Sequence, residues 1–335
     1  MLPVAGKPMI AHTIEWLGRH GVDEVVFSLG YRPDAFTDAF PDAVWAGVKL
    51  AYAVEPEPLD TAGAIHFAAA EVGALSERLL VVNGDILTDL DVSALVALHD
   101  KTGAEGTIHL TPVADPSAYG VVPTEHDGRV VAFIEKPAPG TAPTNFINGG
   151  TYVLEAAALA RIESGRKVSI ERQIFPEMVA DQVLYAHADS TYWIDTGTPR
   201  TYIAAQLDIL AGRRPSVVLP AHHDAVPGIH LGERVRLDGE VLAPALIGAG
   251  AVVHAGATIC NSVVGERAVI EPGASVQSSI VLDGAVIRAD AIVRDSVIGL
   301  DAVIGSGAVI LECSIVGCGV EVEPRARLSG ARLPE

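Results

Sequence analysis

Cysteine is scarce in this 335-residue sequence, and the few cysteines do not suggest pairs. Cys260, Cys313 and Cys318 are an odd number, and none forms a C-x-x-C motif with another. This argues against a disulfide framework and fits a reducing compartment. We therefore predict a cytoplasmic protein whose cysteines are small buried residues.

Aromatic and basic residues are also few. Aromatics make up 5% of a chain that is 49% hydrophobic, so small and β-branched side chains must fill most of the core. Lysine and arginine number 23 against 42 aspartates and glutamates, which gives a net charge of −19. A surface this acidic repels nucleic acid and anionic membrane, and we expect neither as a partner. The acidic surface does not exclude phosphate substrates, because a local lysine or a bound cation can make the electrostatic potential inside a cleft positive.

No stretch is typical of export or of a membrane-spanning helix. The start, MLPVAGKPMI, lacks the basic segment and apolar run of a signal peptide. Residues 246–265 carry no formal charge, but their many glycines, together with His254 and Asn261, make a poor transmembrane helix. A repeat explains this segment better.

The repeat is the most regular feature of the sequence. Apolar residues recur in steps of six, six and five, so that every third one occupies an equivalent position in the series. An α-helix cannot keep this register, and the strands of a β-sandwich alternate over longer spans. The pattern predicts a β-helix in which three short strands form one coil and the coils stack. The series is preceded by looser steps at Ile229, Val235 and Val241, and its members are Ile247, Val253, Ile259, Val264, Ile270, Val276, Val281, Ile287, Val293, Ile298 and Ile304.

Before the repeat, helical and strand patterns alternate, which predicts an α/β domain with a mostly parallel sheet and helices on both faces. We expect the strand over residues 78–82 to be fully buried and the ligand to lie at the carboxyl ends of the strands. The expected helices cover residues 8–20, 62–72 and 91–101, and the expected strands cover residues 23–29, 78–82 and 107–111, with a hairpin over residues 119–135.

Two carboxylates follow apolar stretches and are candidate metal ligands. Asp85 ends the motif Asn-Gly-Asp after a predicted strand, and Asp195 ends Trp-Ile-Asp before a glycine turn. Such carboxylates can hold Mg²⁺ against a triphosphate, because Mg²⁺ prefers a few hard oxygens together with phosphate. The alternatives are an Asx turn at Asp85 and, at Asp195, a cap for a helix beginning at Pro199.

Three further segments are candidates for substrate contact. Lys136 stands at a strand end before a proline and could hold a phosphate, although such a lysine taken alone is more often solvated. Gly149 and Gly150 open a strand, which suggests close approach of the backbone to a ligand. Residues 55–63 form a loop entering a helix, whose backbone N–H groups we expect to be free for a base edge or an anion.

Taken together, eight motifs in order resemble the sugar-1-phosphate nucleotidylyltransferases, also called nucleotide-sugar pyrophosphorylases. They are MLPVAGKPMI, EPEPLDTAG, NGD, ADPSAYGVV, FIEKP, INGGTYVL, VSIERQIFPEMVADQVLYA and WIDTGTPRTY. Within this family, ADPSAYGVV and SIERQIFP are most similar to the mannose-1-phosphate guanylyltransferases. The resemblance covers nearly the whole chain, because the repeat itself resembles the hexapeptide-repeat left-handed β-helix. It implies a Rossmann-like α/β nucleotidyltransferase domain followed by a left-handed parallel β-helix.

The resemblance also implies a reaction and a set of site residues. The phosphate oxygen of a sugar 1-phosphate, for which mannose 1-phosphate is expected, attacks the α-phosphorus of an NTP, for which GTP is expected, and pyrophosphate leaves. Catalysis is then in-line positioning together with neutralisation of charge. By motif, Asp85 and Asp195 hold Mg²⁺ and Lys136 holds the sugar phosphate. Contacts to the sugar or the base come from Leu59, Asp60, Thr61, Gly120, Glu135, Asn148 and Gly150.

Three departures from the family pattern stand out. The chain begins inside the region where the family carries a strand and a Gly-rich loop with Gly-Thr-Arg, so we expect this 335-residue form to be weakly active or inactive. Asp60 stands where glycine is usual. Gly149 stands where alanine is more usual, and Lys7, in the second Lys-Pro position, is expected to be structural.

Several alternatives remain open. The chain could be a glucose-1-phosphate thymidylyl- or uridylyltransferase, or a regulatory subunit of the same fold that binds the sugar nucleotide without making it. An acyltransferase activity of the β-helix is disfavoured, because we interpret His254, the histidine within the regular repeats, as an outward or corner residue. The genomic sequence upstream of Met1 would discriminate between the enzyme and the regulatory subunit.

The predicted organisation has three parts: a nucleotidyltransferase domain over residues 1–212, a linker over residues 213–228 and a β-helix over residues 229–335. Residues 212–228 contain three prolines and the pair His222 and His223. Adjacent residues on an extended chain point apart, so we interpret this pair as exposed linker residues and not as a metal site. A solenoid with a flat apolar face commonly packs against a second copy, so we expect a homo-oligomer.

Overall fold

The computed structural model describes residues 1–214, 217, 219 and 227–334. By its internal contacts the chain divides into two compact units. The α/β unit comprises Met1 and Ile10–Trp193, and the solenoid unit comprises Leu2–Met9 and the chain from Ile194 onward. The domain boundaries given above stay a prediction. Most of the predicted linker, with His222 and His223, lies outside the described residues.

The helices of the α/β unit begin and end close to the predicted residues. The α4 helix begins after Asp91, whose carboxylate accepts the N–H of Ala94, and it ends at Gly103, which has a positive φ of 61°. The three expected helices are thus confirmed, with small differences at their ends. The helices are α1 (Met9–Arg19), α2 (Asp34–Ala39), α3 (Asp60–Glu71), α4 (Val92–Thr102), α5 (Ala156–Leu159) and α6 (Phe175–Ala180), with the 3₁₀ turn η1 (Pro116–Ala118) and the π-helix η2 (Ile170–Ile174).

The strands of the α/β unit form a mixed arrangement. One sheet has the order β3-β5-β4, and another has the order β10-β9-β11-β8-β12 with β6 also paired to β11. The pairs β3–β5 and β8–β12 are parallel, whereas β11 runs antiparallel to both β6 and β8. The strands are β3 (Glu24–Leu29), β4 (Val44–Trp45), β5 (Val48–Val54), β6 (Leu79–Val82), β7 (Ile86–Thr88), β8 (Gly106–Pro112), β9 (Gly120–Val121), β10 (Ile134–Glu135), β11 (Phe146–Leu154) and β12 (Leu184–Ala188).

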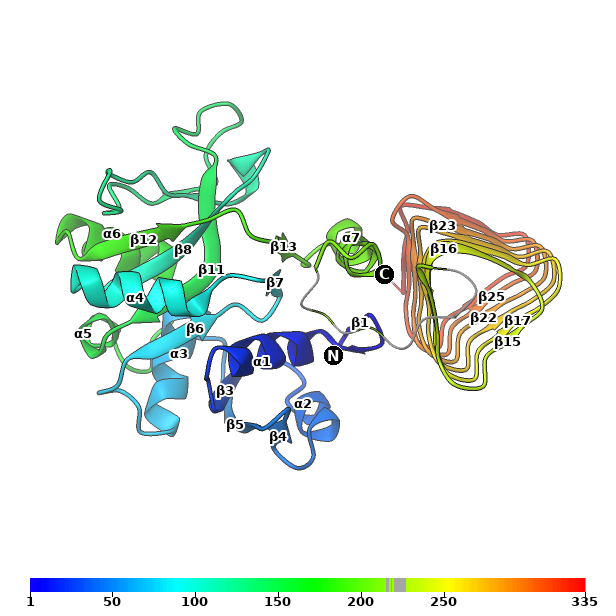
Figure 1. Ribbon diagram of the computed structural model, residues 1–335, viewed down its shortest axis with the longest axis horizontal. Helices are drawn as coiled ribbons and strands as arrows, with labels where there is room; N and C mark the ends of the chain where they lie inside the picture. The colour runs from blue at the N-terminus through cyan, green and yellow to red at the C-terminus, as the bar shows by residue number, and fades with distance from the viewer. Residues whose placement is uncertain (215–216, 218, 220–226, 335) are drawn as a thin grey trace. The chain divides into compact units, whose positions relative to one another are not determined.

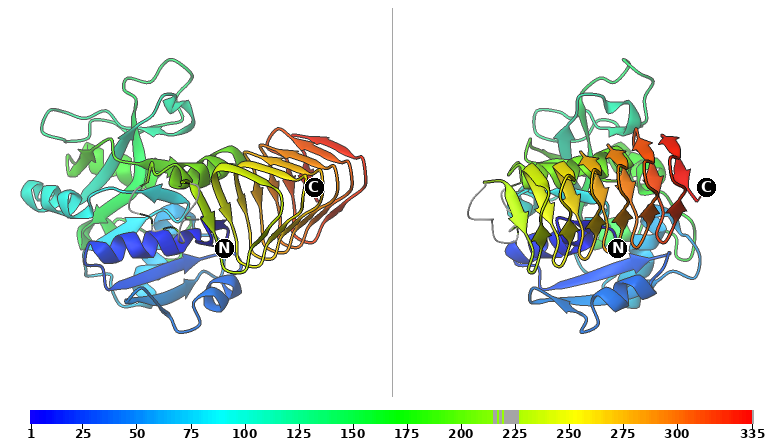
Figure 2. Two further views of the ribbon diagram at one scale, coloured as in Figure 1. Left: turned by 45° about the vertical axis from the view of Figure 1, so that its right-hand side comes forward. Right: turned by 90° about the vertical axis from the view of Figure 1, so that its right-hand side faces the viewer.

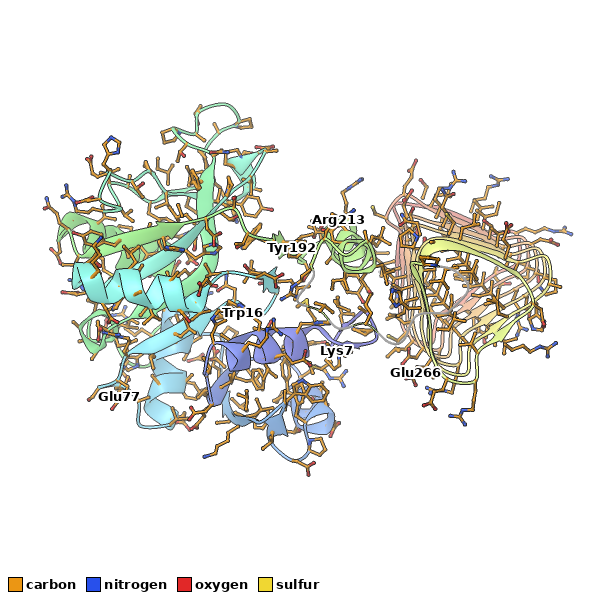
Figure 3. All side chains as sticks on the ribbon, in the orientation of Figure 1. Lys7, Trp16, Glu77, Tyr192, Arg213 and Glu266 are labelled. Carbon is orange, nitrogen blue, oxygen red and sulfur yellow. The ribbon has the colours of Figure 1, made fainter. Side chains whose placement is uncertain are left out.

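Helices cover these strands and bury β8 almost completely. Figure 1 shows α4 lying along β8, β11 and β12, and α3 packs against β3 and β5. Trp16 of α1, which Figure 3 labels, donates its indole N–H to the carbonyl of Leu90 at 2.9 Å. The predicted α/β class is confirmed. The β6 strand, expected to be fully buried, is only half-buried, because among the described residues it pairs along one edge, with β11.

The solenoid unit is the predicted β-helix. Its strands pair in parallel, each with the strand one coil further along, and the coils stack side by side (Figure 2). The strands are β14 (Ile229–Leu231), β15 (Arg236–Leu237), β16 (Glu240–Ile247), β17 (Val252–Val253), β18 (Thr258–Val264), β19 (Val269–Ile270), β20 (Ser275–Gln277), β21 (Ile280–Val281), β22 (Val286–Ile287), β23 (Ile292–Arg294), β24 (Val297–Ile298), β25 (Val303–Ile304), β26 (Val309–Leu311), β27 (Ile315–Val316), β28 (Glu321–Val322), β29 (Arg327–Ser329) and β30 (Arg332–Leu333).

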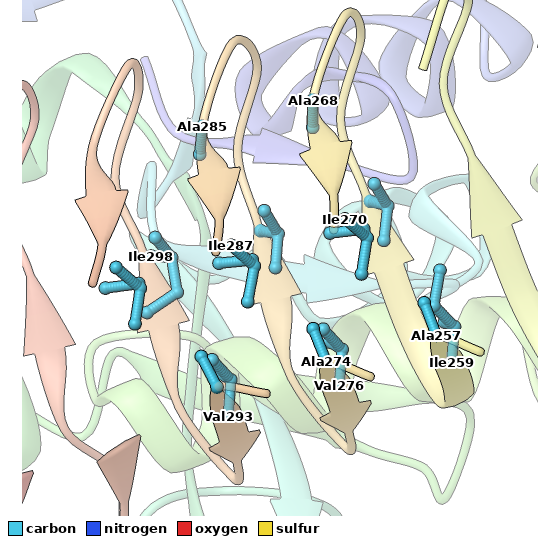
Figure 4. Packing of buried hydrophobic residues seen from close by; sticks show 14 of the residues in the cluster. Ala257, Ile259, Ala268, Ile270, Ala274, Val276, Ala285, Ile287, Val293 and Ile298 are labelled. Atoms are coloured by element: carbon cyan, nitrogen blue, oxygen red, sulfur yellow. The ribbon is translucent and has the colours of Figure 1, made fainter. Parts of the chain in front are cut away.

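The core of the solenoid consists of the residues that the repeat singles out. All eleven apolar residues of the series from Ile247 to Ile304 have 0% exposure, and each lies over its counterpart in the next coil (Figure 4). Close packing of similar side chains at a fixed spacing makes this core continuous. Alanines such as Ala268 and Ala285 are also buried in it.

A second buried column is polar and was not predicted. Ser262, Ser279 and Ser296 are fully buried at successive coils. The hydroxyl of Ser279 donates to the carbonyl of Gln277 at 2.7 Å and accepts the N–H of Ser296 at 3.1 Å, and Ser262 makes the equivalent bonds. Each serine therefore satisfies a backbone N–H at a corner where the ladder between strands is interrupted. The sequence signal is a serine at the same place in successive coils, at Ser262, Ser279 and Ser296, outside the apolar series.

The regular coil lengthens once, beyond the predicted series. Val281 pairs with Ile298, and Ile298 pairs with Val316, so the second coil holds one more residue than the first. The extra residue is accommodated at Glu312 and Cys313, which both have a φ of 58°. The corresponding corner of the previous coil has one such residue, Asp295.

The cysteines are not core residues. Cys260 and Cys313 are half-buried and Cys318 is exposed, so the expectation that they are buried is wrong. Side chains alternate between the two faces of a strand, and Ile259 occupies the inward position next to Cys260.

One outward face of the solenoid is covered within its own unit. The α7 helix (Pro199–Leu210) packs against β16 and β18, and the outward residues Leu246, Val263 and Ile280 are buried. The N-terminal hairpin of β1 (Pro3–Val4) and β2 (Lys7–Pro8) is tied to α7 through Gln206, which accepts the N–H of Ala5 at 3.0 Å. Among the described residues, no helix is both long and apolar enough to cross a bilayer.

Candidate active site

The candidate site in the α/β unit begins where β6 ends. The chain continues from β6 through Asn83 and Gly84 to Asp85, which is exposed. The N–H of Asn83 donates to the carbonyl of Gly150 at 2.8 Å, which joins this turn to β11. Asp85 is thereby presented at the carboxyl end of its strand, as predicted.

The buried hydroxyl of Tyr152 shows which side chains share this region. Burial raises the pKa of Tyr152 far above its usual range, and the charge of Glu171 raises it further. The carboxylates of Asp85 and Glu135 add to this shift, so both lie within electrostatic range of the hydroxyl. The amide nitrogen of Asn148 donates to the Tyr152 oxygen at 2.8 Å. The fold therefore places Asp85 and Glu135 within electrostatic range of a tyrosine whose hydroxyl Asn148 contacts directly.

The hairpin of β9 and β10 brings a second group of predicted residues together. Gly120 is paired with Glu135, and a Cβ on Gly120 would lie 2.7 Å from the ring of Phe133 and 3.2 Å from the Glu135 carboxylate. Lys136 follows with a positive φ of 48°, and its ammonium lies 3.7 Å from Glu135 with 62% of the side chain exposed. The lysine is thus accessible to an anion while its neighbour faces Gly120.

Backbone geometry fixes Asn148 and Gly150 on β11. The side-chain carbonyl oxygen of Asn148 accepts the N–H of Gly150 at 3.0 Å. Gly150 has a φ of 72°, and a Cβ there would lie 2.9 Å from the Asn83 amide. Glycine is therefore required at position 150 by both conformation and space.

Gly149, which departs from the alanine of the family pattern, is explained by its neighbour. A Cβ at position 149 would lie 2.3 Å from Nδ1 of His109, a distance that real side chains do not adopt. Sequence reasoning had no signal for this contact, because the two residues lie on different strands.

The loop that enters α3 corrects one expectation. Its N–H groups are not free: those of Leu59 and Thr61 donate to carboxylates of Glu55 and Asp60, and those of Ala62 and Gly63 donate to the carbonyl of Val168. The side chains of Glu55 and Asp60 and the backbone carbonyl of Val168 therefore occupy these donors. Asp60 has a φ of 61°, which explains why glycine is usual at that position.

Thr61 connects this loop to a residue that the sequence did not single out. Its hydroxyl donates to Glu171 at 2.9 Å and accepts the N–H of Ile170 at 3.0 Å. Glu171 lies on η2 and is the carboxylate with the strongest effect on Tyr152. The SIERQ motif marked this segment as part of the family pattern, but it did not indicate that Glu171 would bind Thr61 or lie near Tyr152.

Asp195 lies in the solenoid unit, at the end of β13 (Trp193–Asp195). Its carboxylate accepts the N–H of Gly197 at 2.7 Å, which is an Asx turn. The alternative of a helix cap at Asp195 is wrong, because Thr198 caps α7 through a capping box with Thr201. Lys7, also in this unit, belongs to the β1–β2 hairpin.

The donors available for a metal ion are hard carboxylate oxygens. Across the described ranges, no group of three or more histidine, cysteine, aspartate or glutamate side chains forms a ready-made metal site. A cation held here would need further oxygens from its substrate, which suits an ion that binds through one or two carboxylates and phosphate.

The fold and these motifs define a nucleotidyltransferase. The chain belongs to the nucleotidyl transferase family, whose model matches residues 1–212, and a second model, the GMPPB C-terminal domain, matches residues 241–334. Enzymes of this family act on small-molecule nucleotide and sugar-phosphate substrates and generally use a divalent metal ion.

Among its relatives is the mannose-1-phosphate guanylyltransferase of Mycobacterium tuberculosis, 37% identical over 77% of this chain and 70% of that protein. The mannose-1-phosphate guanyltransferase of Schizosaccharomyces pombe is 34% identical over 68% of this chain and 64% of its own length. Among solved structures, HddC from Yersinia pseudotuberculosis matches with a TM-score of 0.54 and 29% identity over 62% of this chain and 88% of that chain. A structure of HddC complexed with GMP-PN matches equally well.

Proposed function

We propose that this protein transfers a guanylyl group from GTP to mannose 1-phosphate, giving GDP-mannose and pyrophosphate. The observation that carries the proposal is the hairpin of β9 and β10, which pairs Glu135 with Gly120 and leaves the Lys136 ammonium exposed 3.7 Å from Glu135. The names of the relatives support the choice of nucleotide and sugar.

In the proposed reaction the sugar phosphate is the nucleophile, and the protein positions it. The Lys136 ammonium binds the phosphate of the sugar and holds its oxygen in line with the α-phosphorus of GTP. Glu135, Asn148 and Gly150 contact sugar hydroxyls, and Gly120 lets the sugar approach the backbone. Leu59, Asp60 and Thr61 line the nucleotide base.

Asp85 and Asp195 are assigned from their motifs as the ligands of Mg²⁺. When bound, Mg²⁺ neutralises the charge that develops on the phosphates. Both side chains supply hard carboxylate oxygens, which are the ligands that Mg²⁺ prefers, and Asp85 is exposed.

The test is a substrate panel, in which release of pyrophosphate is measured for GTP, dTTP and UTP with mannose 1-phosphate and glucose 1-phosphate. The binding of each NDP-sugar is measured in parallel by calorimetry, because binding does not depend on turnover. We expect GTP with mannose 1-phosphate to give the highest kcat/KM. A preference for dTTP or UTP with glucose 1-phosphate would replace this proposal, and tight binding of GDP-mannose without turnover would indicate a regulatory subunit.

Asp85→Asn tests the metal assignment. The neutral amide is a poor Mg²⁺ ligand, so we expect the Mg²⁺ concentration for half-maximal turnover to rise at least about tenfold and kcat to fall by about 10²-fold or more. Asp42→Asn is the matched control, since Asp42 is an exposed aspartate outside the site. An unchanged Mg²⁺ dependence in Asp85→Asn would remove Asp85 from the metal site.

We also propose that the protein is cytoplasmic and forms a homo-oligomer through its solenoid. Val252, Val269 and Val286 form an outward column that is only half-buried, on a different face from the one under α7. Light scattering of the purified chain tests this, and Val269→Glu is expected to shift a dimer to a monomer. A monomer in the unmodified protein would contradict it.

A further inference from the structure

His109 is a buried side chain for which the proposed reaction has no direct use. It lies in the middle of β8 with 0% exposure, and its Nε2 is 3.1 Å from a carboxylate oxygen of Asp189. Its Nδ1 has no hydrogen-bond partner among the described residues. A buried polar atom without a partner is costly, so its position calls for a physical explanation.

The unpartnered nitrogen faces the backbone of Gly149. A Cβ at that position would lie 2.3 Å from Nδ1, 2.9 Å from Cε1 and 3.0 Å from Cγ of the imidazole. The ring therefore lies flush against the glycine Cα and leaves no room for a methyl group.

The imidazole is not free to swing away. Asp189 holds its far nitrogen, and Asp189 is itself fixed by the N–H and hydroxyl of Thr191. On the neighbouring strand β12, His187 stands in register with His109.

Gly149 lies between two residues of the candidate site. The register of β11 on β8 shifts between Asn148 and Tyr152, so residues 149–151 form an irregular segment opposite His109. The carbonyl of Gly149 accepts the indole N–H of Trp193 at 2.9 Å, and Asn148 binds both Gly150 and Tyr152. A displacement of the Gly149 backbone would therefore also move its neighbours Asn148 and Gly150.

We propose that His109 is a positioning residue whose imidazole, anchored by Asp189, supports the irregular segment of β11 at Gly149 and thereby sets Asn148 and Gly150 for the sugar of the substrate. Positions 109 and 149 then form a coupled pair, in which histidine at one requires glycine at the other. The part of this inference that concerns the sugar of the substrate rests on the proposed function. The coupling between positions 109 and 149 does not.

The coupling is tested by a double-mutant cycle on the full chain with Gly149→Ala, His109→Thr and the double variant. Threonine is chosen because Thr107 and Thr111 already occupy the same row of β8. Melting is followed by tryptophan fluorescence, since Trp16, Trp45 and Trp193 all lie in the α/β unit. We expect Gly149→Ala to lower Tm by several degrees or to prevent folding, and the same change in the His109→Thr background to cost less than half as much. Equal losses in both backgrounds would overturn the pairing, and so would a double variant that does not fold if Gly149→Ala alone does not fold.

The positioning role is tested by binding of GDP-mannose and GTP, measured by calorimetry. We expect His109→Thr to raise the Kd for GDP-mannose at least tenfold and the Kd for GTP less than threefold. His109→Gln, whose amide can still donate to Asp189, is expected to restore most of the affinity. An unchanged Kd for GDP-mannose in His109→Thr would overturn the positioning role. If the unmodified protein binds neither ligand, the proposed function fails while the thermal cycle still decides the coupling.

Discussion

At the scale of single residues, backbone conformation explains choices that side-chain chemistry alone does not. Asp60 and Lys136 both have positive φ values, of 61° and 48°. An aspartate tolerates this conformation because its carboxylate bonds locally, here to the N–H of Thr61 at 2.9 Å. The carboxylate at Asp60 is thus explained by the turn, with no need for a role in catalysis.

Asp60 gives a prediction about stability. Glycine adopts a positive φ without steric cost and alanine does not, so Asp60→Ala should be less stable than Asp60→Gly by about 1 kcal/mol. Urea denaturation followed by tryptophan fluorescence measures the difference in the α/β unit. The same pair of changes at Asp38, an exposed residue of α2, is the control and should give the opposite order, because a helix favours alanine over glycine. Equal stabilities at position 60 would mean that the loop relaxes out of this conformation.

At the scale of secondary-structure elements, the solenoid depends on both an apolar and a polar column. The buried hydroxyl of Ser279 satisfies the N–H of Ser296. Ser279→Ala leaves that donor without a partner in a dry core, which should cost about 1–3 kcal/mol. Far-UV circular dichroism in urea reports the loss of β structure, and Ser306→Ala, at an exposed corner of the same solenoid, is the control. A loss no larger than that of the control would show that the N–H finds another acceptor.

The lengthened coil gives a second prediction at this scale. Deleting Cys313 restores the regular coil length and leaves Glu312 as the only residue of positive φ at that corner, as Asp295 is in the previous coil. We expect the deletion to leave Tm unchanged or higher. Deleting Ser278 from a coil of regular length should instead lower it, because a one-residue slip turns side chains to the opposite face. A large loss of stability on deleting Cys313 would show that the extra residue is required by its surroundings.

At the scale of the whole molecule, the two compact units need not unfold together, and acidity should affect the α/β unit first. Burial lowers the pKa of His187 from its ordinary 6.5, although Asp189 opposes this shift. The unfolded chain therefore binds a proton more readily than the folded one, and the stability that His187 contributes is lost as the pH falls below about 6.5.

Asp189 acts in the same direction at lower pH. Burial favours its neutral form, but hydrogen bonds from His109 and Thr191 outweigh burial and lower the pKa from the ordinary 3.8. Its contribution is present above that value and is lost as the pH falls through the lowered pKa. The urea midpoint from tryptophan fluorescence should therefore fall between about pH 7 and pH 5.5 and again below about pH 4. His187→Gln should flatten the first step, whereas the exposed His126→Gln should not. A first step that persists in His187→Gln would assign it to another group.

The solenoid, the three helices α1, α3 and α4 and the family could all be predicted from the sequence. The period of the β-helix follows from local geometry that every coil repeats, so Ile247 and its counterparts could be placed in the core without knowing anything distant in the chain. Asp85 at the end of β6 followed in the same way from a local strand and turn.

Which backbone groups are already hydrogen-bonded, and which positions depend on each other, follows from contacts between distant segments of the folded chain. The N–H groups of Ala62 and Gly63 are consumed by the carbonyl of Val168, and Gly149 is required by His109 on another strand. Both contacts join segments that are far apart in the chain. Such pairs depend on strand order and register, which arise from the packing of the whole sheet and leave no periodic trace in the sequence.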